Sequence, residues 1–431
     1  MLFKNITIID EDFNVKENMN IGIEGEIIDY IGEDEPSKDY GNIYDGKGKL
    51  MIPCFYNAHS HLPMAYMRGY GENLPLMDWL NGKIFPFEAK MTEEDMYYGC
   101  LLGIAEMLRF GIGATQDMYL NYHAVGRAME KSGIKGAFSH SITCFGDESY
   151  NELPEYKETL EALERFKTGT GDRVRMELAL HAEYTSTEKV ARGIAELAAE
   201  RGLGMHVHVS ETEGEVSNCR ERHGGKTPVE YLHDCGIFDG RVVAAHCVHI
   251  NEDDMAILRE DKVTVASCPK SNAKLGSGIC PINKLLNAGV NVALGTDSVA
   301  SNNNLNMIEE MRFFSYLQKA TENNPVAIST KETLYAATRA GAIAQGRMDS
   351  GLISLGYKAD ITVLDIGRIY MKPSYNILDN LVFAGSGNDV VLTMVDGQIL
   401  YKDGEYPTLD IDHIMYEVEK NRNRILGELN N

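Results

Sequence analysis

The 431-residue sequence lacks the features that mark extracellular and membrane proteins. Its eight cysteines include no Cys-x-x-Cys pair, and several lie in apolar stretches, so we expect reduced thiols and no thiolate zinc site. No apolar run reaches the roughly 18 residues that a membrane helix needs, and the start of the chain has no signal-peptide pattern. These absences predict a cytoplasmic protein with no membrane partner.

Basic residues are also scarce. Lys and Arg total 41 against 64 Asp and Glu, which gives a formal charge of −23. Because a field of this sign repels polyanions, we expect no nucleic-acid partner. An apolar content of 44% excludes disorder, and the length suits either two or three domains or one large α/β barrel with an appendage.

The two ends of the chain differ in texture from its middle. Short β-type runs broken by Gly, Asp and Asn occur at 5–10 and 21–28 and return at 359–365 and 390–400. Neither end alone has enough strands to bury a core, so we expect both to join in one small β-sandwich domain. This domain would comprise residues 1–50 and 356–431, the latter including a C-terminal helix.

The middle of the chain alternates short apolar runs with helical patterns. One such helix is expected from Thr187, which can cap it, to Gly202, which can end it. Eight such units predict a (β/α)8 barrel over residues 51–355. Its strands are expected near 52–57, 113–117, 135–140, 174–181, 204–210, 241–247, 262–267 and 290–295.

Histidines follow the first and fifth strand candidates. His59 and His61 are two residues apart, so a strand places both imidazoles on one face. This motif is short, and a pair of hydrogen-bonded polar residues explains it equally well. The fifth candidate supplies His208 and Glu211, which we interpret as a metal ligand and a base. His206 fits better as a barrel-interior or ligand-supporting residue.

The sixth and eighth candidates end at His246 and Asp297. Taken singly, His246 fits a hydrogen-bonded core histidine and Asp297 a helix cap as well as either fits a functional group. Together with the first and fifth candidates, however, they place polar chemistry at the C-terminal ends of four strands. Barrel active sites lie at that face, so the combination favours function.

Three imidazoles and one carboxylate with an open coordination position suit one Zn²⁺ or Fe²⁺, whose bound water loses a proton near neutral pH. We expect Asp297 to hold or deprotonate that water and Glu211 to pass its proton to the substrate. His246 is expected to polarise the attacking group. The sequence therefore predicts a hydrolytic enzyme.

At these residues the sequence resembles the amidohydrolase superfamily and, within it, the 5′-methylthioadenosine/S-adenosylhomocysteine deaminases. Typical motifs are Asn-Ala-His-Ser-His at 57–61 and Gly-Thr-Asp-Ser at 295–298. The resemblance covers nearly the whole chain. The stretches that carry it are 57–64, 73–80, 208–211, 245–249, 267–278, 295–305 and 356–360.

The resemblance implies hydrolytic deamination of an adenine nucleoside with one divalent metal. It assigns the metal to His59, His61, His208 and Asp297, and catalysis to Glu211, His246 and Asp297. It also places Trp79 and Glu88 near the ribose and His181 near the purine, beside Glu211. Core packing, a surface charge and a capped strand end are the respective alternatives for Trp79, Glu88 and His181. Residues 176–183 contain no lysine, which agrees with a single metal because binuclear relatives use a bridging lysine there.

The segment 139–152 departs from the expected pattern. Relatives that act on S-adenosylhomocysteine are expected to read its carboxylate with arginines there, whereas this segment has no arginine and three acidic residues. A neutral or positively charged 5′ substituent on the ribose therefore fits better.

Other functions stay open from the sequence. The same chemistry could act on guanine, a pterin, a triazine or aminodeoxyfutalosine, and a non-catalytic metal-binding homologue is the alternative from another class. A homo-oligomer is also left open. Segments 69–79 and 144–154 are candidate loops over the barrel mouth.

Overall fold

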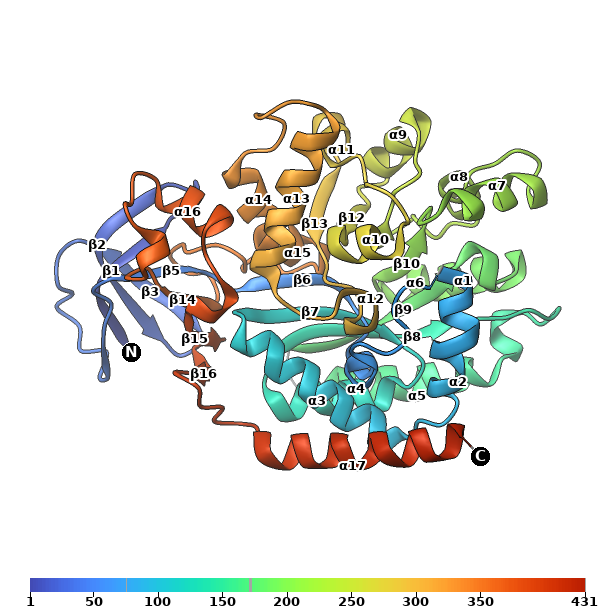
Figure 1. The fold of residues 1–431 in the computed structure, drawn as a ribbon, viewed down its shortest axis with the longest axis horizontal. Coiled ribbons are helices and arrows are strands. Elements are labelled where there is room, and N and C mark those ends of the chain that lie inside the picture. Colours follow the sequence, from blue (N-terminus) through green and yellow to red (C-terminus); the bar gives the residue numbers. More distant parts are fainter. Residues whose placement is uncertain (75, 170–172, 431) are drawn as a thin grey trace.

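The computed structural model describes residues 1–74, 76–169 and 173–430, and its larger part is a parallel barrel (Figure 1). Its eight strands are hydrogen-bonded in chain order, and Ser60 forms a parallel bridge with Asp297 that closes the ring. The predicted (β/α)8 barrel is confirmed. The strands are β6 (Phe55–Ser60), β7 (Ile112–Tyr119), β8 (Lys135–Ile142), β9 (Val174–Ala182), β10 (Met205–Val209), β11 (Val242–His246), β12 (Thr264–Ser267) and β13 (Asn291–Leu294).

Helices follow the strands and cover the outside of the barrel, and their ends have clear local causes. In α6, the Thr187 hydroxyl accepts a hydrogen bond from the Val190 amide, and Gly202 ends the helix at a φ of 64°. The principal helices are α3 (Glu93–Arg109), α4 (Tyr122–Ser132), α5 (Pro154–Gly169), α6 (Glu188–Arg201), α7 (Glu213–Arg222), α8 (Pro228–Asp234), α9 (Glu252–Glu260), α10 (Pro269–Leu275), α11 (Ile282–Ala288), α12 (Val299–Asn302), α13 (Met307–Thr321), α14 (Thr330–Ala337) and α15 (Arg339–Ala344).

Both ends of the chain meet in a second sheet beside the barrel, as expected (Figure 1). Strand β5 pairs with β1 from the N-terminal part and with β14 from the C-terminal part, which joins the two ends. The sheet is mixed and continuous. Its strands are β1 (Leu2–Ile9), β2 (Val15–Glu24), β3 (Ile27–Gly32), β4 (Ile43–Asp45), β5 (Lys49–Pro53), β14 (Ile361–Asp365), β15 (Val390–Val395) and β16 (Gln398–Lys402).

A buried ion-pair cluster links this sheet to the barrel. The ammonium of Lys135, which begins β8, lies 2.7 Å from Asp360 and 2.6 Å from Asp396, both in the C-terminal part. Tyr56 of β6 donates to the same Asp360 carboxylate at 2.5 Å. Because charges this deeply buried are stable only when paired, the cluster fixes the sheet against the barrel.

The last helix, α17 (Ile411–Leu429), packs along α3 rather than on the terminal sheet (Figure 1). Asn421 donates to the Tyr66 hydroxyl, and Arg424 forms an ion pair with Asp95 at the start of α3.

Among the described residues, no helix has both the length and the apolar character to cross a membrane.

The first predicted strand, 52–57, spans two observed strands. Residues up to Pro53 belong to β5 of the terminal sheet, and β6 of the barrel begins at Phe55. The chain passes from one sheet to the other at Cys54. The sequence does not reveal this break, because the continuous apolar run at 51–55 is typical of a single buried strand.

Candidate active site

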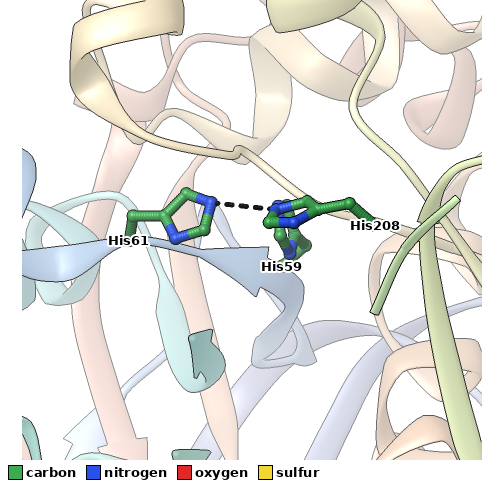
Figure 2. A group of neighbouring side chains, drawn as sticks. All are labelled: His59, His61 and His208. Atoms are coloured by element: carbon green, nitrogen blue, oxygen red, sulfur yellow. Dashed lines mark hydrogen bonds between the residues drawn. The ribbon is translucent and has the colours of Figure 1, made fainter. Parts of the chain in front are cut away.

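Four predicted ligands come together at the C-terminal ends of the barrel strands. Figure 2 shows His59 and His61 from the end of β6 facing His208 from β10. The Nε2 atoms of His61 and His208 are 3.4 Å apart. Asp297 follows β13, and its Oδ1 lies 3.6 Å from Nε2 of His59 and 3.4 Å from Nε2 of His61.

The opposite nitrogen of each imidazole is held from behind. Nδ1 of His61 lies 2.6 Å from the Met118 carbonyl and Nδ1 of His208 lies 2.7 Å from the His181 carbonyl, so both nitrogens carry the proton and donate it. Nδ1 of His59 instead meets Nε2 of His206 at 2.9 Å. All three Nε2 atoms are thereby left toward the centre.

These donors fit a single divalent metal. Nε2 of His59 is buried and has no hydrogen-bond partner among the described residues. Burial lowers the pKa of His59 and His208 well below the ordinary value, so both are neutral at pH 7, the form that coordinates a metal. Three imidazoles with one carboxylate form a typical site for a catalytic divalent ion.

The Asp297 carboxylate is oriented by three donors. Its Oδ2 accepts from the hydroxyls of Ser271 and Ser301, and its Oδ1 accepts from the Ser298 amide at 2.7 Å. The two hydroxyls occupy Oδ2, so only Oδ1 faces the histidines. This geometry favours binding of a metal through one oxygen.

Glu211 and His246 lie at the rim of this centre. Oε2 of Glu211 is 3.8 Å from Nε2 of His246, and Oε1 accepts from the Ser277 hydroxyl at 3.1 Å. Nδ1 of His246 meets the side-chain oxygen of Asn272 at 2.9 Å. An oxygen acceptor requires the proton on Nδ1, so Nε2 is the nitrogen that faces the site. Both residues are nine-tenths or more buried.

The three residues expected at the substrate are placed by separate elements. Trp79 ends α1 (Leu76–Trp79) and is buried. Glu88 ends α2 (Phe85–Glu88), and its carboxylate accepts from the Tyr119 hydroxyl at 2.5 Å; burial raises its pKa to about 7. Nδ1 of His181 lies 3.0 Å from the Thr185 hydroxyl, within hydrogen-bond distance, and burial lowers the pKa of His181 to about 4.

His206 stands behind the ligands, as a supporting residue would, and contacts His59 rather than the open centre. Sequence reasoning did not single out Ser271 and Asn272, which orient Asp297 and His246. They lie within the segment 267–278 that carried the family resemblance, but nothing in their residue types showed which side chains they contact.

The two candidate mouth loops are anchored at several points. In 69–79, Glu72 pairs with Lys274 of α10 at 2.9 Å and accepts from Asn303. In 144–154, the Cys144 amide donates to the Thr185 carbonyl at 2.9 Å. Residue 75 lies outside the described residues.

A second group of possible ligands, formed by Glu183, Cys219 and His223, lies apart from this centre. Its carboxylate is already paired with Arg222 and lies 2.7 Å from Nε2 of His223. The group is therefore better explained as an ion-pair network than as a metal site.

Comparison with known proteins finds relatives that match nearly the whole chain. The chain is 38% identical to a 5-methylthioadenosine/S-adenosylhomocysteine deaminase of Thermoanaerobacter pseudethanolicus over 99% of both proteins. It is 40% identical to the protein of that name from Dictyoglomus thermophilum over 97% of both.

Among solved structures, an adenosine deaminase from Xanthomonas campestris with bound zinc matches 99% of this chain and 98% of its own, with a TM-score of 0.93 and 28% identity. A guanine deaminase from C. acetobutylicum shares the fold over 92% of this chain and 99% of its own, with a TM-score of 0.81 and 22% identity. The model of the amidohydrolase family matches residues 50–400, and the chain therefore belongs to this family.

Proposed function

We propose that the protein is a hydrolytic deaminase that converts an adenine nucleoside and water to the inosine analogue and ammonia. The observation that carries this proposal is the placement of Glu211 and His246 beside the Asp297 carboxylate and three Nε2 atoms that face the centre of the site. The relatives named as deaminases of adenine nucleosides support the substrate class.

His59, His61, His208 and Asp297 would hold the metal, and zinc is the ion we propose, because the solved structure of the relative from Xanthomonas campestris contains it. Iron is the alternative that the same donors accept. When bound, the ion supplies the Lewis acidity that lowers the pKa of a water molecule toward neutrality.

The protein side chains manage the protons. Glu211 takes one proton from the attacking water and passes it to the ring nitrogen beside the carbon under attack. The Asp297 carboxylate accepts the second proton of this water and returns it to the amino group, which leaves as ammonia. Burial lowers the pKa of His246, but the charges of Glu211 and Asp297 outweigh this effect and raise it above the ordinary value. With both ring nitrogens protonated, Nε2 of His246 donates to the developing oxyanion and stabilises it. Hydrogen bonds from Ser277 to Glu211 and between His246 and Asn272 fix both groups before the substrate arrives.

Trp79, Glu88 and His181 form the substrate-binding part of the proposed site. A carboxylate such as Glu88 suits two ribose hydroxyls, since it accepts two hydrogen bonds. His181 is neutral at pH 7 because burial lowers its pKa to about 4. Its Nε2 can therefore form a hydrogen bond with an uncharged purine.

We further propose that the preferred 5′ substituent is neutral or cationic. Segment 139–152 is described in full and contains no arginine, while Asp147, Glu148 and Glu152 lie in it. The Glu152 carboxylate already accepts hydrogen bonds from the Ser149 amide and hydroxyl at the start of its own helical turn. A carboxylate substituent therefore has no guanidinium partner in this segment.

The experiment measures loss of adenine absorbance and release of ammonia by zinc-loaded protein. The panel is 5′-deoxyadenosine, 5′-methylthioadenosine, adenosine and S-adenosylhomocysteine. We expect the first three to react faster than S-adenosylhomocysteine. No turnover on the whole panel would refute the proposed substrate class and favour another amino-heterocycle.

Glu211→Gln tests the mechanism with the same assay. The amide cannot carry the proton, so we expect kcat to fall at least about 100-fold while the zinc content stays at the wild-type value. Glu230→Gln on α8 is the control for a general effect of losing a carboxylate. Wild-type kcat in Glu211→Gln would remove this residue from the proton transfer.

A further inference from the structure

Glu215 is a buried carboxylate on the first turn of α7 that the proposed chemistry does not use. Its Oε1 accepts from the Ser210 amide at 2.8 Å and its Oε2 accepts from the Glu211 amide at 2.7 Å. The two oxygens therefore hold two successive backbone amides, one of which belongs to Glu211 itself.

Thr212 and Glu215 form a capping box on α7, but this motif does not account for the two short contacts. In a capping box, the third helical residue accepts from the amide of the cap residue. Glu230 does this on α8, where it accepts from the Thr227 amide at 2.7 Å. Glu215 is 3.5 Å from the equivalent Thr212 amide and makes its short bonds one and two residues earlier.

The turn that Glu215 holds is strained, carries Glu211 and contacts the loop that follows His246. Ser210 has a φ of 50°, a conformation that costs free energy for a residue other than glycine. Its carbonyl accepts from the amides of Val248 and His249 at 3.1 and 2.9 Å, in the loop that follows His246. Glu215 therefore holds the backbone amides of this turn, and the Ser210 carbonyl of the same turn holds the loop after His246.

We infer that Glu215 is a positioning residue that sets Glu211 and His246 relative to each other. This inference rests on the proposed function, since it concerns the same proton transfer. A displacement of about 1 Å of a catalytic group can cost roughly 100-fold in rate, so loss of the two short bonds should act on kcat. It should not remove the metal, because none of the four proposed ligands contacts Glu215 in a hydrogen bond.

The test compares Glu215→Gln with Glu230→Gln, which makes the same substitution in the capping box of α8. For each variant of the zinc-loaded protein, we would measure kcat and KM for 5′-deoxyadenosine, zinc content, thermal stability and amide hydrogen exchange in the peptide around Ser210 and Glu211. Glu215→Asp is a second variant, because it keeps the charge but is too short to reach both amides.

We expect Glu215→Gln and Glu215→Asp to lower kcat by at least about 10-fold, with KM within about threefold of wild type and full zinc content. Amide exchange at Ser210 and Glu211 should become at least about 10-fold faster, whereas Glu230→Gln should change neither quantity. Equal kcat in the Glu215 and Glu230 variants would overturn the inference.

Failure of the proposed function gives a different result. If wild-type protein does not deaminate the nucleosides, the amide exchange decides alone, because it needs no substrate. If the Ser210 and Glu211 amides then exchange at the wild-type rate in both Glu215 variants, Glu215 does not fix the turn and the inference is refuted. Faster exchange of these amides would support it.

Discussion

Replacing His206 with phenylalanine should weaken metal binding without weakening the metal-free fold. His206 is fully buried, and its Nε2 is the only partner that the structure shows for Nδ1 of His59 among the described residues. Phenylalanine is also a planar ring and is only slightly larger than histidine, so it fills the site and leaves no cavity. What is lost is the hydrogen bond that keeps the proton on Nδ1 of His59.

The size of the effect follows from the two tautomers of His59. With metal bound, Nε2 must be unprotonated, so Nδ1 carries the proton and is left beside the new phenyl ring as a buried donor without an acceptor. Such a group costs about 1–3 kcal/mol, which corresponds to roughly 5- to 150-fold in metal affinity. Without metal, His59 can move the proton to Nε2, which faces the open centre, and most of this cost disappears.

The assay is competition for zinc with a chelator of known affinity, together with thermal unfolding in excess zinc and in excess chelator. We expect His206→Phe to bind zinc about 10- to 100-fold more weakly, with an unchanged unfolding temperature in chelator. His206→Gln is the control, because its side-chain oxygen can accept from His59. Wild-type zinc affinity in His206→Phe, or equal destabilisation with and without zinc, would refute this reasoning.

Two further predictions concern buried charges. Lys135→Met removes the cation that pairs with the Asp360 carboxylate, so we expect the free energy of unfolding, measured with urea, to fall by about 3–5 kcal/mol. Arg165→Met, which breaks an exposed ion pair, is the control and should cost less than about 1 kcal/mol. Equal losses in the two variants would contradict this prediction. Burial raises the folded-state pKa of Glu88 to about 7 from 4.5, so its contribution to stability is present below pH 4.5 and is lost as the pH rises to about 7. Relative to wild type, Glu88→Gln should therefore gain unfolding free energy across this window, and a constant difference would contradict the pKa.

The barrel and the cluster of proposed metal ligands could be predicted because their signals are local. Each strand candidate carried its own apolar run, and every proposed ligand stood at the end of such a run, as His208 and Asp297 do. The rule that barrel sites lie at the C-terminal ends of strands then brought these residues together without any knowledge of distances.

Contacts between segments distant in the chain could not be predicted in this way. Ser271 is an ordinary hydroxyl in sequence, and it reaches Asp297 only because α10 packs against α12, the helix that follows Asp297. The same holds for Tyr119, which donates to Glu88 from the end of β7. Composition and periodicity carry no information on which polar side chains of different units meet.

Backbone strain is the other feature that the residue types concealed. Ser210, His246, Cys247 and Asp297 all have positive φ values between 46° and 74°, although none is glycine, and all lie at the ends of β10, β11 and β13. The conformation is maintained by contacts between these turns: the Cys247 amide donates to the Val209 carbonyl, and the Asp297 amide donates to the His59 carbonyl. Since a left-handed residue turns the chain abruptly out of the strand, these positions can aim functional side chains inward while the chain leaves toward the next helix. The free energy that this costs is offset by the closed ring of strands, which can therefore hold strained residues at the proposed catalytic centre.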